Sequence, residues 1–491
     1  MMTSRAFLAV AAFLTVWSAK ADFEVYFLRH GQTTWNRAKI LQGSVADTRL
    51  TPKGERMAKH TAAGLAAAGI AFDRAYTSPY LRARRTAELV TAGLKMPAAV
   101  VDPRLREMGF GKYEGLRYEK GAWPDDNLRR FFEDPETYVP QGEGAETIVQ
   151  VRGRVRDFLE NELKPLDGKV KRVLCVAHSL ILGAVVRELS DGNVPEAAKR
   201  AIQPNCCVHV VRYANGRFTL EETGRVFYDA AAFGGPEGPA MVAHRGAGDL
   251  TMPEASRPAY SNAVETACDV VKLDLQSTAD GVIVMGHDPT LKRNMGWDVK
   301  IGKVTYADIL KKGVFLKKGG FADERIVRLD EALAILKVVP QFWIDFKHFD
   351  PDFAERVVAE FRKQGIDESR IMVATFARSS LEYMQKHHPK IRRVGHVSMK
   401  QGEDGKWSSN CGEKAGTHDE AIGDVLAYRD RLGLYGVNMP VLKEQTTPDD
   451  VRRLKEAGLW VSLWFVQKAD KAAFYRPVAD AFVTDHASQV R

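Results

Sequence analysis

The stretch EVYFLRHGQTTWN occupies residues 24–36 and decides the fold of the first half of the chain. Its opening part, residues 24–28, is mostly apolar and has the length of a strand buried on both faces. Arg29 and His30 follow this strand directly. Polar side chains at the carboxyl end of a parallel strand lie where open α/β sheets bind their ligands. The stretch therefore predicts a ligand site beside His30.

The residues around this stretch alternate between strand-like and helix-like patterns. Further strands are expected at 74–77, 172–177 and 207–212, and amphipathic helices at 53–68, 81–92 and 148–163. This alternation predicts a doubly wound, mostly parallel α/β sheet covered by helices on both faces. A second histidine, His178, directly follows the strand at 172–177. We therefore expect His178 and His30 to meet in one crevice.

Glycine and proline crowd residues 234–239, which predicts a linker between a first domain at 22–233 and a second at 240–491. Strands in the second domain are expected at 241–243, 270–273, 282–285, 342–344, 371–374, 392–397, 434–438, 460–465 and 481–483, with helices such as 352–364 and 448–457 between them. About eight β/α units in roughly 250 residues are typical of a TIM barrel, and the surplus strand is assigned to an early hairpin.

The composition is that of a soluble protein with material for two cores, with 45% hydrophobic and 27% charged residues in 491. The net charge of +8 favours anionic partners such as phosphate esters. No stretch predicts nucleic-acid binding or a membrane span. The sequence does not predict an oligomeric state.

Residues 1–21 have the features of a signal peptide. Arg5 precedes an apolar run at 6–17, and Ala19-Lys20-Ala21 supplies a small-x-small cleavage pattern. We expect the mature chain to begin near Asp22 and to reach the periplasm or the extracellular space. The alternative is a buried N-terminal helix.

More motifs follow the first stretch in a fixed order. They are LQG at 41–43, LTPKG at 50–54, TSPYLRA at 77–83 and LREMGFG at 105–111. Together with residues 29–36, they resemble the histidine phosphatase (phosphoglycerate mutase-like) superfamily over roughly residues 23–225. The resemblance implies that this domain needs no metal or other cofactor.

The resemblance also implies the chemical roles of five side chains. His30 is the implied nucleophile, a neutral imidazole that attacks phosphorus. Arg29, Arg82 and a protonated His178 would surround the phosphoryl oxygens. Glu107 would protonate the leaving oxygen and later deprotonate water.

The same resemblance implies two secondary contacts but does not decide the reaction type. Asn36 and Gln42 are implied phosphate or substrate contacts. Mutases and phosphatases share this site, so the motifs do not separate them. Export disfavours a glycolytic mutase, because its substrates are cytosolic, and favours hydrolysis of a phosphomonoester.

The second domain carries its own ordered motifs. They are AHRG at 243–246, PE at 253–254, KLD at 272–274, DG at 280–281, HD at 287–288, IDFK at 344–347, Trp464, and VTD at 483–485. This order resembles the glycerophosphodiester phosphodiesterase family over residues 240–491. The resemblance implies a barrel whose catalytic face lies at the carboxyl ends of its strands.

The resemblance implies that His244 and His287 form an acid/base pair across the scissile phosphodiester. Arg245 and Lys347 are implied phosphate contacts, and Trp464 is an implied substrate contact. Glu254 is expected to support the site.

The family binds a divalent cation, Ca²⁺ or Mg²⁺, through a Glu-x-Asp pair and a later glutamate, and here the chain departs from that pattern. Lys272 stands at the first glutamate position, which leaves Asp274 and Asp345 as candidate metal ligands. An ammonium in this place repels a hard cation. Either Lys272 replaces the metal and neutralises the phosphate, or the barrel has lost activity and only binds phosphodiesters or a partner.

The leading hypothesis is an exported bifunctional hydrolase that serves phosphate scavenging from lipid-derived esters. The barrel would cleave a glycerophosphodiester to glycerol 3-phosphate and an alcohol, and the first domain would release phosphate from that monoester. The alternative is an active phosphatase with a catalytically degenerate barrel that serves as a binding module.

Overall fold

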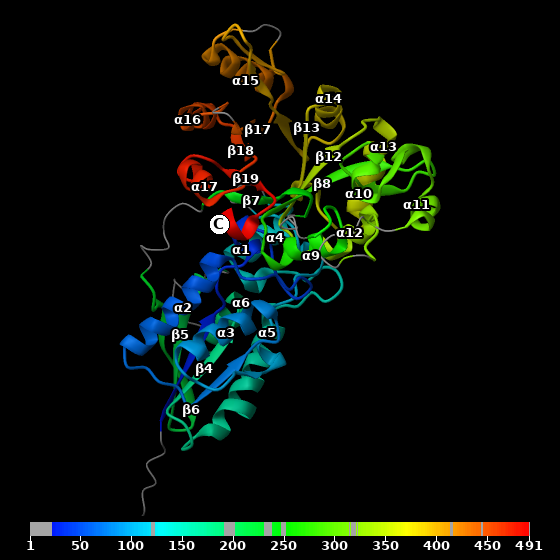
Figure 1. Cartoon of the computed structure of the whole chain (residues 1–491). Coiled ribbons are helices and arrows are strands. Elements are labelled where there is room, and N and C mark those ends of the chain that lie inside the picture. The colour runs from blue at the N-terminus through cyan, green and yellow to red at the C-terminus, as the bar shows by residue number, and fades with distance from the viewer. Residues whose placement is uncertain are drawn as a thin grey trace, which may run out of the picture.

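The computed structural model describes residues 22–118, 123–190, 202–229, 238–246, 252–313, 315, 321, 323–412, 416–442 and 445–490. The predicted signal peptide at 1–21 and most of the predicted linker, residues 234–237, lie outside these ranges. Figure 1 shows two α/β bodies, the first half of the chain below and the second half above.

The first body is built on a six-stranded sheet with strand order β3-β2-β4-β1-β5-β6. The strands are β1 (Phe23–Arg29), β2 (Arg74–Thr77), β3 (Val100–Val101), β4 (Arg172–Ala177), β5 (Cys207–Ala214) and β6 (Arg217–Val226). Strands β1 to β4 pair in parallel, while β5 and β6 are antiparallel and extend the sheet beyond β1.

Helices cover both faces of this sheet. They are α1 (Thr34–Ala38), α2 (Pro52–Ala67), α3 (Leu81–Gly93), α4 (Asp126–Glu133), α5 (Ile148–Phe158) and α6 (Ser179–Leu189). Helices α2 and α3 pack on one face, and α4, α5 and α6 pack on the other. The doubly wound α/β class is therefore confirmed.

The apolar run of β1 is continuous because each face of the strand meets a different core. Val25 and Phe27 pack with α5 and α6, whereas Tyr26 and Leu28 pack with α2 and α3. Successive side chains of a strand point to opposite faces, so a strand covered on both sides needs apolar residues at nearly every position.

The glycine after His30 is required by a close backbone approach. A Cβ atom on Gly31 would lie 2.5 Å from the carbonyl oxygen of Gly54, at the start of α2. Helix α2 begins there because Thr51 accepts a hydrogen bond from the Gly54 N–H at 3.0 Å and Pro52 occupies the first helical position. The motifs at 29–36 and 50–54 thus pack against each other.

The second body is a closed barrel of eight parallel strands. In ring order they are β7 (Ala240–Ala243), β8 (Val270–Ser277), β12 (Gln341–Phe346), β13 (Ile371–Thr375), β14 (Arg392–His396), β17 (Gly436–Pro440), β18 (Trp460–Trp464) and β19 (Ala481–Thr484). The predicted TIM barrel is confirmed, and the surplus strand β9 (Ile283–Met285) forms the expected antiparallel hairpin with β8.

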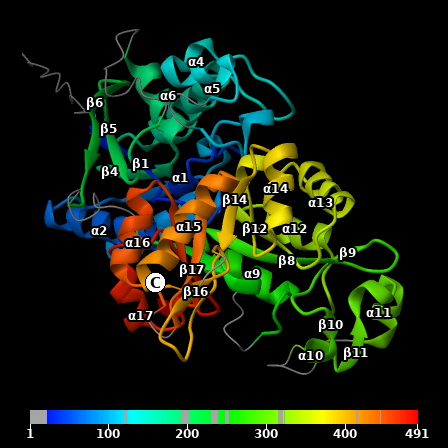
Figure 2. The ribbon, with the colours of Figure 1, turned by 90° about the horizontal axis from the view of Figure 1, so that it is seen from above.

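Helices surround the barrel, and two insertions extend it. The helices are α9 (Arg257–Glu265), α12 (Leu329–Leu336), α13 (Pro351–Lys363), α14 (Arg378–His387), α15 (His418–Leu432), α16 (Pro448–Glu456), α17 (Ala469–Tyr475) and α18 (Ala487–Val490). The first insertion contains β10 (Thr290–Leu291), α10 (Lys292–Met295), β11 (Trp297–Lys300) and α11 (Tyr306–Lys312), and it projects from the side of the barrel (Figure 2). The second is the hairpin of β15 (Met399–Gln401) and β16 (Trp407–Ser409).

The expected helix at 148–163 differs from the observed one. Its α-helical part ends at Phe158, and residues Leu159–Leu163 form a π-helical turn. Pro165 follows within two residues of this turn. Because proline clashes with the preceding helical turn, the helix cannot continue regularly past this point.

The base of the barrel rests on the first body next to α1 (Figure 1). The Trp35 indole N–H donates to the Val338 carbonyl at 2.8 Å, and the Arg370 guanidinium lies 5.2 Å from the Trp35 ring centre. Arg37 donates to the Gly238 carbonyl at 2.8 Å. The barrel residues of this contact all precede strands, so the contact uses the amino ends of the barrel.

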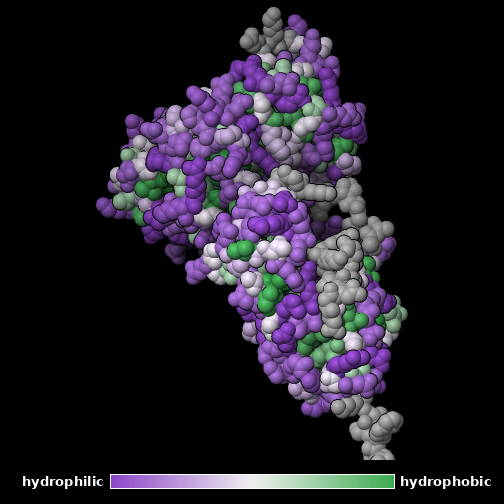
Figure 3. Space-filling view, turned by 180° about the vertical axis from the view of Figure 1, so that it is seen from behind, coloured by the Kyte–Doolittle hydropathy of each residue, from purple (hydrophilic) through white to green (hydrophobic). Residues whose placement is uncertain are grey.

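The length and hydropathy of the helices in the described ranges decide whether one of them could cross a membrane. None of the helices described there is both long and apolar enough to cross a bilayer. The face seen in Figure 3 is predominantly hydrophilic, and its hydrophobic residues form small separate groups.

Arg370 is predicted to be the main polar support of the barrel base. It is 2% exposed and donates to the carbonyls of Lys337, Val339 and Pro340. Replacing it by methionine leaves three acceptors unpaired and should lower the free energy of unfolding by about 3 kcal/mol, measured by urea denaturation. Arg378→Met, at an exposed ion pair on α14, is the control and should change it by less than about 0.5 kcal/mol. Equal losses in both variants would contradict this role.

Candidate active sites

The first candidate site lies where two neighbouring parallel strands end. His30 follows β1 and His178 follows β4, and their ring centres lie 5.2 Å apart. The two strands pair in register up to Arg29 and Ala177. The structure thus brings together the two histidines that the sequence placed in one crevice.

His30 is held in the tautomer that a nucleophile needs. Its Nδ1 lies 2.8 Å from the Gly31 carbonyl, which can only accept, so Nδ1 carries the proton and Nε2 keeps its lone pair. Burial, and then the charges of Arg29 and Arg82, lower the pKa of His30 well below its ordinary value. The imidazole is therefore neutral at neutral pH.

The second histidine was expected to be protonated beside a phosphoryl group. Burial, followed by the charge of Arg82, lowers the pKa of His178 well below its ordinary value, so this ring is also neutral here. Its Nε2 lies 2.7 Å from the Ser78 hydroxyl, and its Nδ1 has no hydrogen-bond partner among the described residues. A phosphoryl dianion beside both rings would favour a proton on His178.

Two buried guanidinium groups flank the histidines. Arg82 donates to the Gly43 carbonyl at 2.9 Å and lies 3.7 Å from Asp47, while Arg29 donates to the Gln203 carbonyl. The Nε atoms of both arginines are buried without a hydrogen-bond partner in the described part of the chain. Buried donors of this kind are suited to an anionic ligand.

Glu107 has the electrostatics of a buried acid. Burial raises its pKa above the ordinary value for glutamate, although the Met108 N–H at 2.9 Å and the charge of Arg82 partly oppose this. The Leu180 N–H, at the start of α6, donates to its other oxygen at 3.4 Å. A carboxyl group held in this way can give and take a proton at the site.

Asn36 and Gln42 lie in the same cleft, joined through Thr33. Thr33 receives the Asn36 N–H at 3.1 Å and donates its hydroxyl to the Gln42 carbonyl oxygen at 2.9 Å. The cleft is also lined by Phe110, Tyr118, Phe131 and Leu180. The sequence analysis missed these four, because a buried apolar or aromatic residue has no pattern that separates a site wall from a core.

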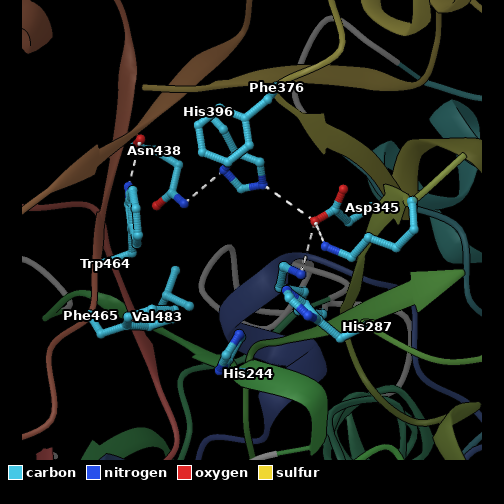
Figure 4. Close-up of a pocket in the computed structure, with 11 residues that line it drawn as sticks. His244, His287, Asp345, Phe376, His396, Asn438, Trp464, Phe465 and Val483 are labelled. Atoms are coloured by element: carbon cyan, nitrogen blue, oxygen red, sulfur yellow. Dashed lines mark hydrogen bonds and ion pairs between the residues drawn. The ribbon is translucent and has the colours of Figure 1, made fainter. Parts of the chain in front are cut away.

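The second candidate site lies at the carboxyl ends of the barrel strands (Figure 4). The Nδ1–H of His244 donates to Asp485 at 2.8 Å, and that of His287 donates to Asp288 at 2.7 Å. Both rings line one cavity of about 110 Å³. A carboxylate on Nδ1 fixes the ring and leaves Nε2 for chemistry, so the two histidines are oriented in the same manner.

Four charged groups form a closed ring of ion pairs at this site. The Lys272 ammonium pairs with Asp274 and lies 3.0 Å from Asp345. The Lys347 ammonium lies 2.9 Å from Asp274 and 2.7 Å from Asp345. Lys347, the expected phosphate contact, also bridges the same two carboxylates.

Neighbouring opposite charges in this ring favour the ionised forms of Lys272, Asp274 and Asp345. Burial alone would lower the pKa of Lys272, but the charges of Asp274 and Asp345 outweigh it, so the pKa is raised. Burial opposes ionisation of both aspartates, yet the neighbouring Lys272 brings their pKa values below the ordinary range. Lys272, Asp274 and Asp345 are therefore charged at neutral pH.

Arg245 and Glu254 form a second layer of charge. Arg245 donates to Glu254 at 2.8 Å, and its Nε lies 3.6 Å from Asp274. Glu254 also accepts two hydrogen bonds from Arg293, at 2.6 and 2.8 Å. Despite burial, Arg293 and Arg245 lower the pKa of Glu254 to about 2. Glu254 therefore supports the site as a permanent anion.

His396 is a site residue that the sequence analysis missed. The Ser462 hydroxyl donates to the Asn438 amide oxygen at 2.8 Å, which leaves the Asn438 NH₂ to donate to His396 Nδ1 at 2.9 Å. The proton of His396 therefore sits on Nε2, which lies 3.7 Å from Asp345. Three residues from neighbouring strands make this contact, and no local sequence motif could show it.

Aromatic side chains form the opposite wall of the cavity. Trp464 comes from the seventh barrel strand, as expected, and donates its indole N–H to the Asn438 carbonyl at 3.2 Å. Phe376 and Phe465 complete the wall, and Phe376 is 52% exposed. In Figure 4, Trp464 and Phe465 lie across the cavity from Asp345.

The residues present do not fit the divalent cation that the family binds. Asp274 and Asp345 are each bridged by two ammonium groups rather than open toward a common point. Within the described ranges, no group of three or more His, Cys, Asp or Glu side chains is arranged to hold a metal ion.

Each body thus carries a site with two histidines beside buried cationic side chains. The chain belongs to two enzyme families: residues 25–225 match the Histidine phosphatase superfamily (branch 1), and residues 244–489 match the Glycerophosphoryl diester phosphodiesterase family. It is therefore a two-domain phosphoesterase.

Relatives match one half of the chain at a time. The first half is 33% identical over 193 residues to "Probable phosphoglycerate mutase GpmB" of Cronobacter sakazakii, covering 39% of this chain and 85% of that protein. It is 29% identical over 198 residues to "Uncharacterized phosphatase PhoE" of Bacillus subtilis, covering 40% and 92%. A glycerophosphodiester phosphodiesterase structure from Agrobacterium tumefaciens covers 51% of this chain and 97% of its own, at 20% identity and a TM-score of 0.40.

The carboxylates on Nδ1 are predicted to set the basicity of the barrel histidines. Burial lowers the pKa of His244, and Asp485 partly offsets this. Asp485→Asn should therefore lower the pKa of His244 further, measured by NMR titration of the ring proton. Asp288→Asn is the matched control, which should shift His287 and leave His244 unchanged. An unchanged His244 pKa in Asp485→Asn would rule out this role.

Proposed function

We propose that the chain is an exported, bifunctional phosphate-ester hydrolase, with residues 1–21 as its signal peptide. The barrel would cleave a glycerophosphodiester to glycerol 3-phosphate and an alcohol, and the first domain would hydrolyse the monoester. The observation that carries the proposal is the presence of two complete histidine pairs on one chain: His30 with His178, and His244 with His287.

In the first domain, the proposed reaction has two steps. The Nε2 lone pair of His30 forms a bond to phosphorus, the P–O bond to the alcohol breaks, and Glu107 gives its proton to the leaving oxygen. Water then attacks the phosphohistidine, Glu107 takes a proton from that water, and the P–N bond breaks. The net change converts a monoester and water to phosphate and an alcohol.

Electrostatics support these roles. Burial keeps His30 neutral and raises the pKa of Glu107, so the nucleophile and the acid coexist in their working forms on the acidic side of neutrality. Arg29 and Arg82 would offset the charge on the transferring phosphoryl group. Hydrolysis is favoured over a mutase reaction by the proposed export, since a glycolytic substrate is cytosolic.

In the barrel, the two histidines would share the proton transfers. One, as the neutral ring, takes the proton of the attacking oxygen as its bond to phosphorus forms. The other, as an imidazolium, gives its Nε2 proton to the leaving alkoxide as the second P–O bond breaks. The matching carboxylate supports of His244 and His287 fit either assignment.

The arrangement of the domains bears on how the reactions are linked. The barrel base contacts the first domain through residues that precede β7, β8, β12 and β13, while the barrel site lies at the opposite ends of those strands. A product of the barrel therefore leaves its mouth on the side away from the first domain. The tandem reaction would proceed through released glycerol 3-phosphate.

The second candidate function is an active phosphatase with a degenerate barrel that binds phosphodiesters or a partner. Lys272 at the expected glutamate position favours it. An inactive barrel would leave glycerophosphocholine intact, while glycerol 3-phosphate would still be hydrolysed.

Glu107→Gln is predicted to lose the proton donor while keeping the shape of the cleft. The kcat/KM for glycerol 3-phosphate should fall about a thousandfold, whereas that for p-nitrophenyl phosphate should fall far less, since its leaving group needs no proton. Steady-state kinetics on both substrates measures the difference. Glu88→Gln, an exposed glutamate on α3, is the control. Equal losses on both substrates would argue against a general acid.

Separating the two activities tests the tandem reaction. His30→Ala should convert glycerophosphocholine only to glycerol 3-phosphate, and His244→Ala should hydrolyse only added glycerol 3-phosphate. A mixture of the two variants should release phosphate at the wild-type rate per site, because the intermediate passes through solvent. Phosphorus NMR follows each species. A diester that stays intact with the wild-type chain contradicts the tandem function, and a mixture much slower than wild type contradicts the free intermediate.

A further inference from the structure

We infer that the barrel cleaves its phosphodiester without a divalent cation, with the Lys272 ammonium supplying the charge at that position and Lys347 acting beside it. The inference rests on the proposed diesterase function. It assigns Lys272 as a catalytic residue of the barrel that contacts the substrate phosphate. The proposed phosphatase reaction of the first domain does not depend on Lys272.

The position of Lys272 is the first ground. Its side chain projects from β8 into the barrel end, is 5% exposed, and lies between Asp274 of the same strand and Asp345 of the neighbouring strand β12. Asp274 and Asp345 are directly paired in register. An ammonium therefore stands between the two carboxylates that remain from the family's metal-binding pattern.

The charge balance is the second ground. A lysine in place of a glutamate adds two positive charges, which equals the charge of a divalent cation. Lys272 and Lys347 carry two positive charges against two on Asp274 and Asp345, so this ring is neutral without a metal ion. Arg245 and Arg293 add two positive charges, and Glu254 and Asp288 add two negative ones. The ring therefore presents no net negative charge to a phosphodiester, which itself carries one negative charge.

The remaining hydrogen-bond donors are the third ground. Each ammonium has three N–H groups, and both Lys272 and Lys347 use two of them on Asp274 and Asp345. Both lysines line the cavity together with His244 and His287. Each therefore has one donor left for a non-bridging phosphate oxygen, within reach of the two histidines.

His396 closes the ring from the other side. Its Nε2–H faces Asp345 at 3.7 Å, and it stacks on Trp343 with ring centres 5.6 Å apart. Burial lowers the pKa of His396, so the ring is neutral and adds no charge. We assign it as a positioning residue that holds the Asp345 carboxylate toward the two lysines.

The reaction then balances with protein groups alone. The attacking oxygen forms a bond to phosphorus and yields its proton to one histidine. The bond between phosphorus and the leaving oxygen breaks, and that oxygen takes the Nε2 proton of the other histidine, which enters the step as an imidazolium. Proton exchange with solvent then restores the starting protonation state of both rings. The ammonium groups keep their protons throughout and stabilise the charge on the non-bridging oxygens.

Mn²⁺ binding to the full-length chain tests the inference directly. Electron paramagnetic resonance should detect no stoichiometric binding of Mn²⁺ to the wild type after chelator treatment. Lys272→Glu rebuilds a carboxylate pair and should bind about one equivalent, and the added change Asp274→Asn should abolish that binding. Lys400→Glu, an exposed lysine on β15, is the matched control and should leave binding unchanged. One equivalent of Mn²⁺ on the wild type, lost with Asp274→Asn alone, would overturn the inference.

Turnover in excess chelator is the second measurement. The wild type should cleave glycerophosphocholine at an unchanged rate, and Lys272→Met should lose about a hundredfold or more. Hydrolysis of glycerol 3-phosphate by the same preparation reports that the variant is folded. Diester cleavage that stops in chelator and returns with Mn²⁺ overturns the inference but leaves the diesterase standing. A diester that stays intact with or without Mn²⁺ contradicts the proposed diesterase function and, with it, the inferred catalytic role of Lys272.

Discussion

Parallel strand pairing is the constraint on which both sites depend. Strands that run in the same direction present their carboxyl ends at one edge, so residues distant in the chain become neighbours there. In the first body, β1 and β4 are joined in register, and that register alone brings His30 within ring contact of His178. In the barrel, closure through β7, β8 and β12 does the same for His244, Lys272 and Asp345.

Much of this arrangement could be predicted because short local patterns of apolar and polar residues determine it. The strand at residues 74–77 and the strand at 172–177 were expected at their observed limits. The hairpin partner of β8 was also expected. In each case, an apolar run ends in polar or glycine residues, and covering both faces of the sheet requires such a run. The side chains that follow these runs are placed by the strands themselves.

The rest depended on contacts that no local pattern records. The Nε2–H of His396 faces Asp345 because Asn438 and Ser462, which lie on other strands, fix the tautomer of the ring. The lowered pKa of His178 in the chain without a bound phosphoryl group follows from burial and the nearby Arg82, which no local pattern shows. The ion pairs of Lys347 with two carboxylates, on β8 and β12, were not expected either. Burial and through-space charge are tertiary properties.

The contact at Trp35 links the barrel base to the proposed phosphatase chemistry by a single peptide bond. Trp35 is 3% exposed because barrel residues Val338 and Arg370 cover it, and the next residue, Asn36, faces the cleft of His30. Substitutions at the barrel base would thus alter the proposed monoesterase reaction, through Trp35 and Asn36, without changing a residue of either cleft. In a genetic screen for loss of phosphate release, the first domain would have part of its mutational target inside the second.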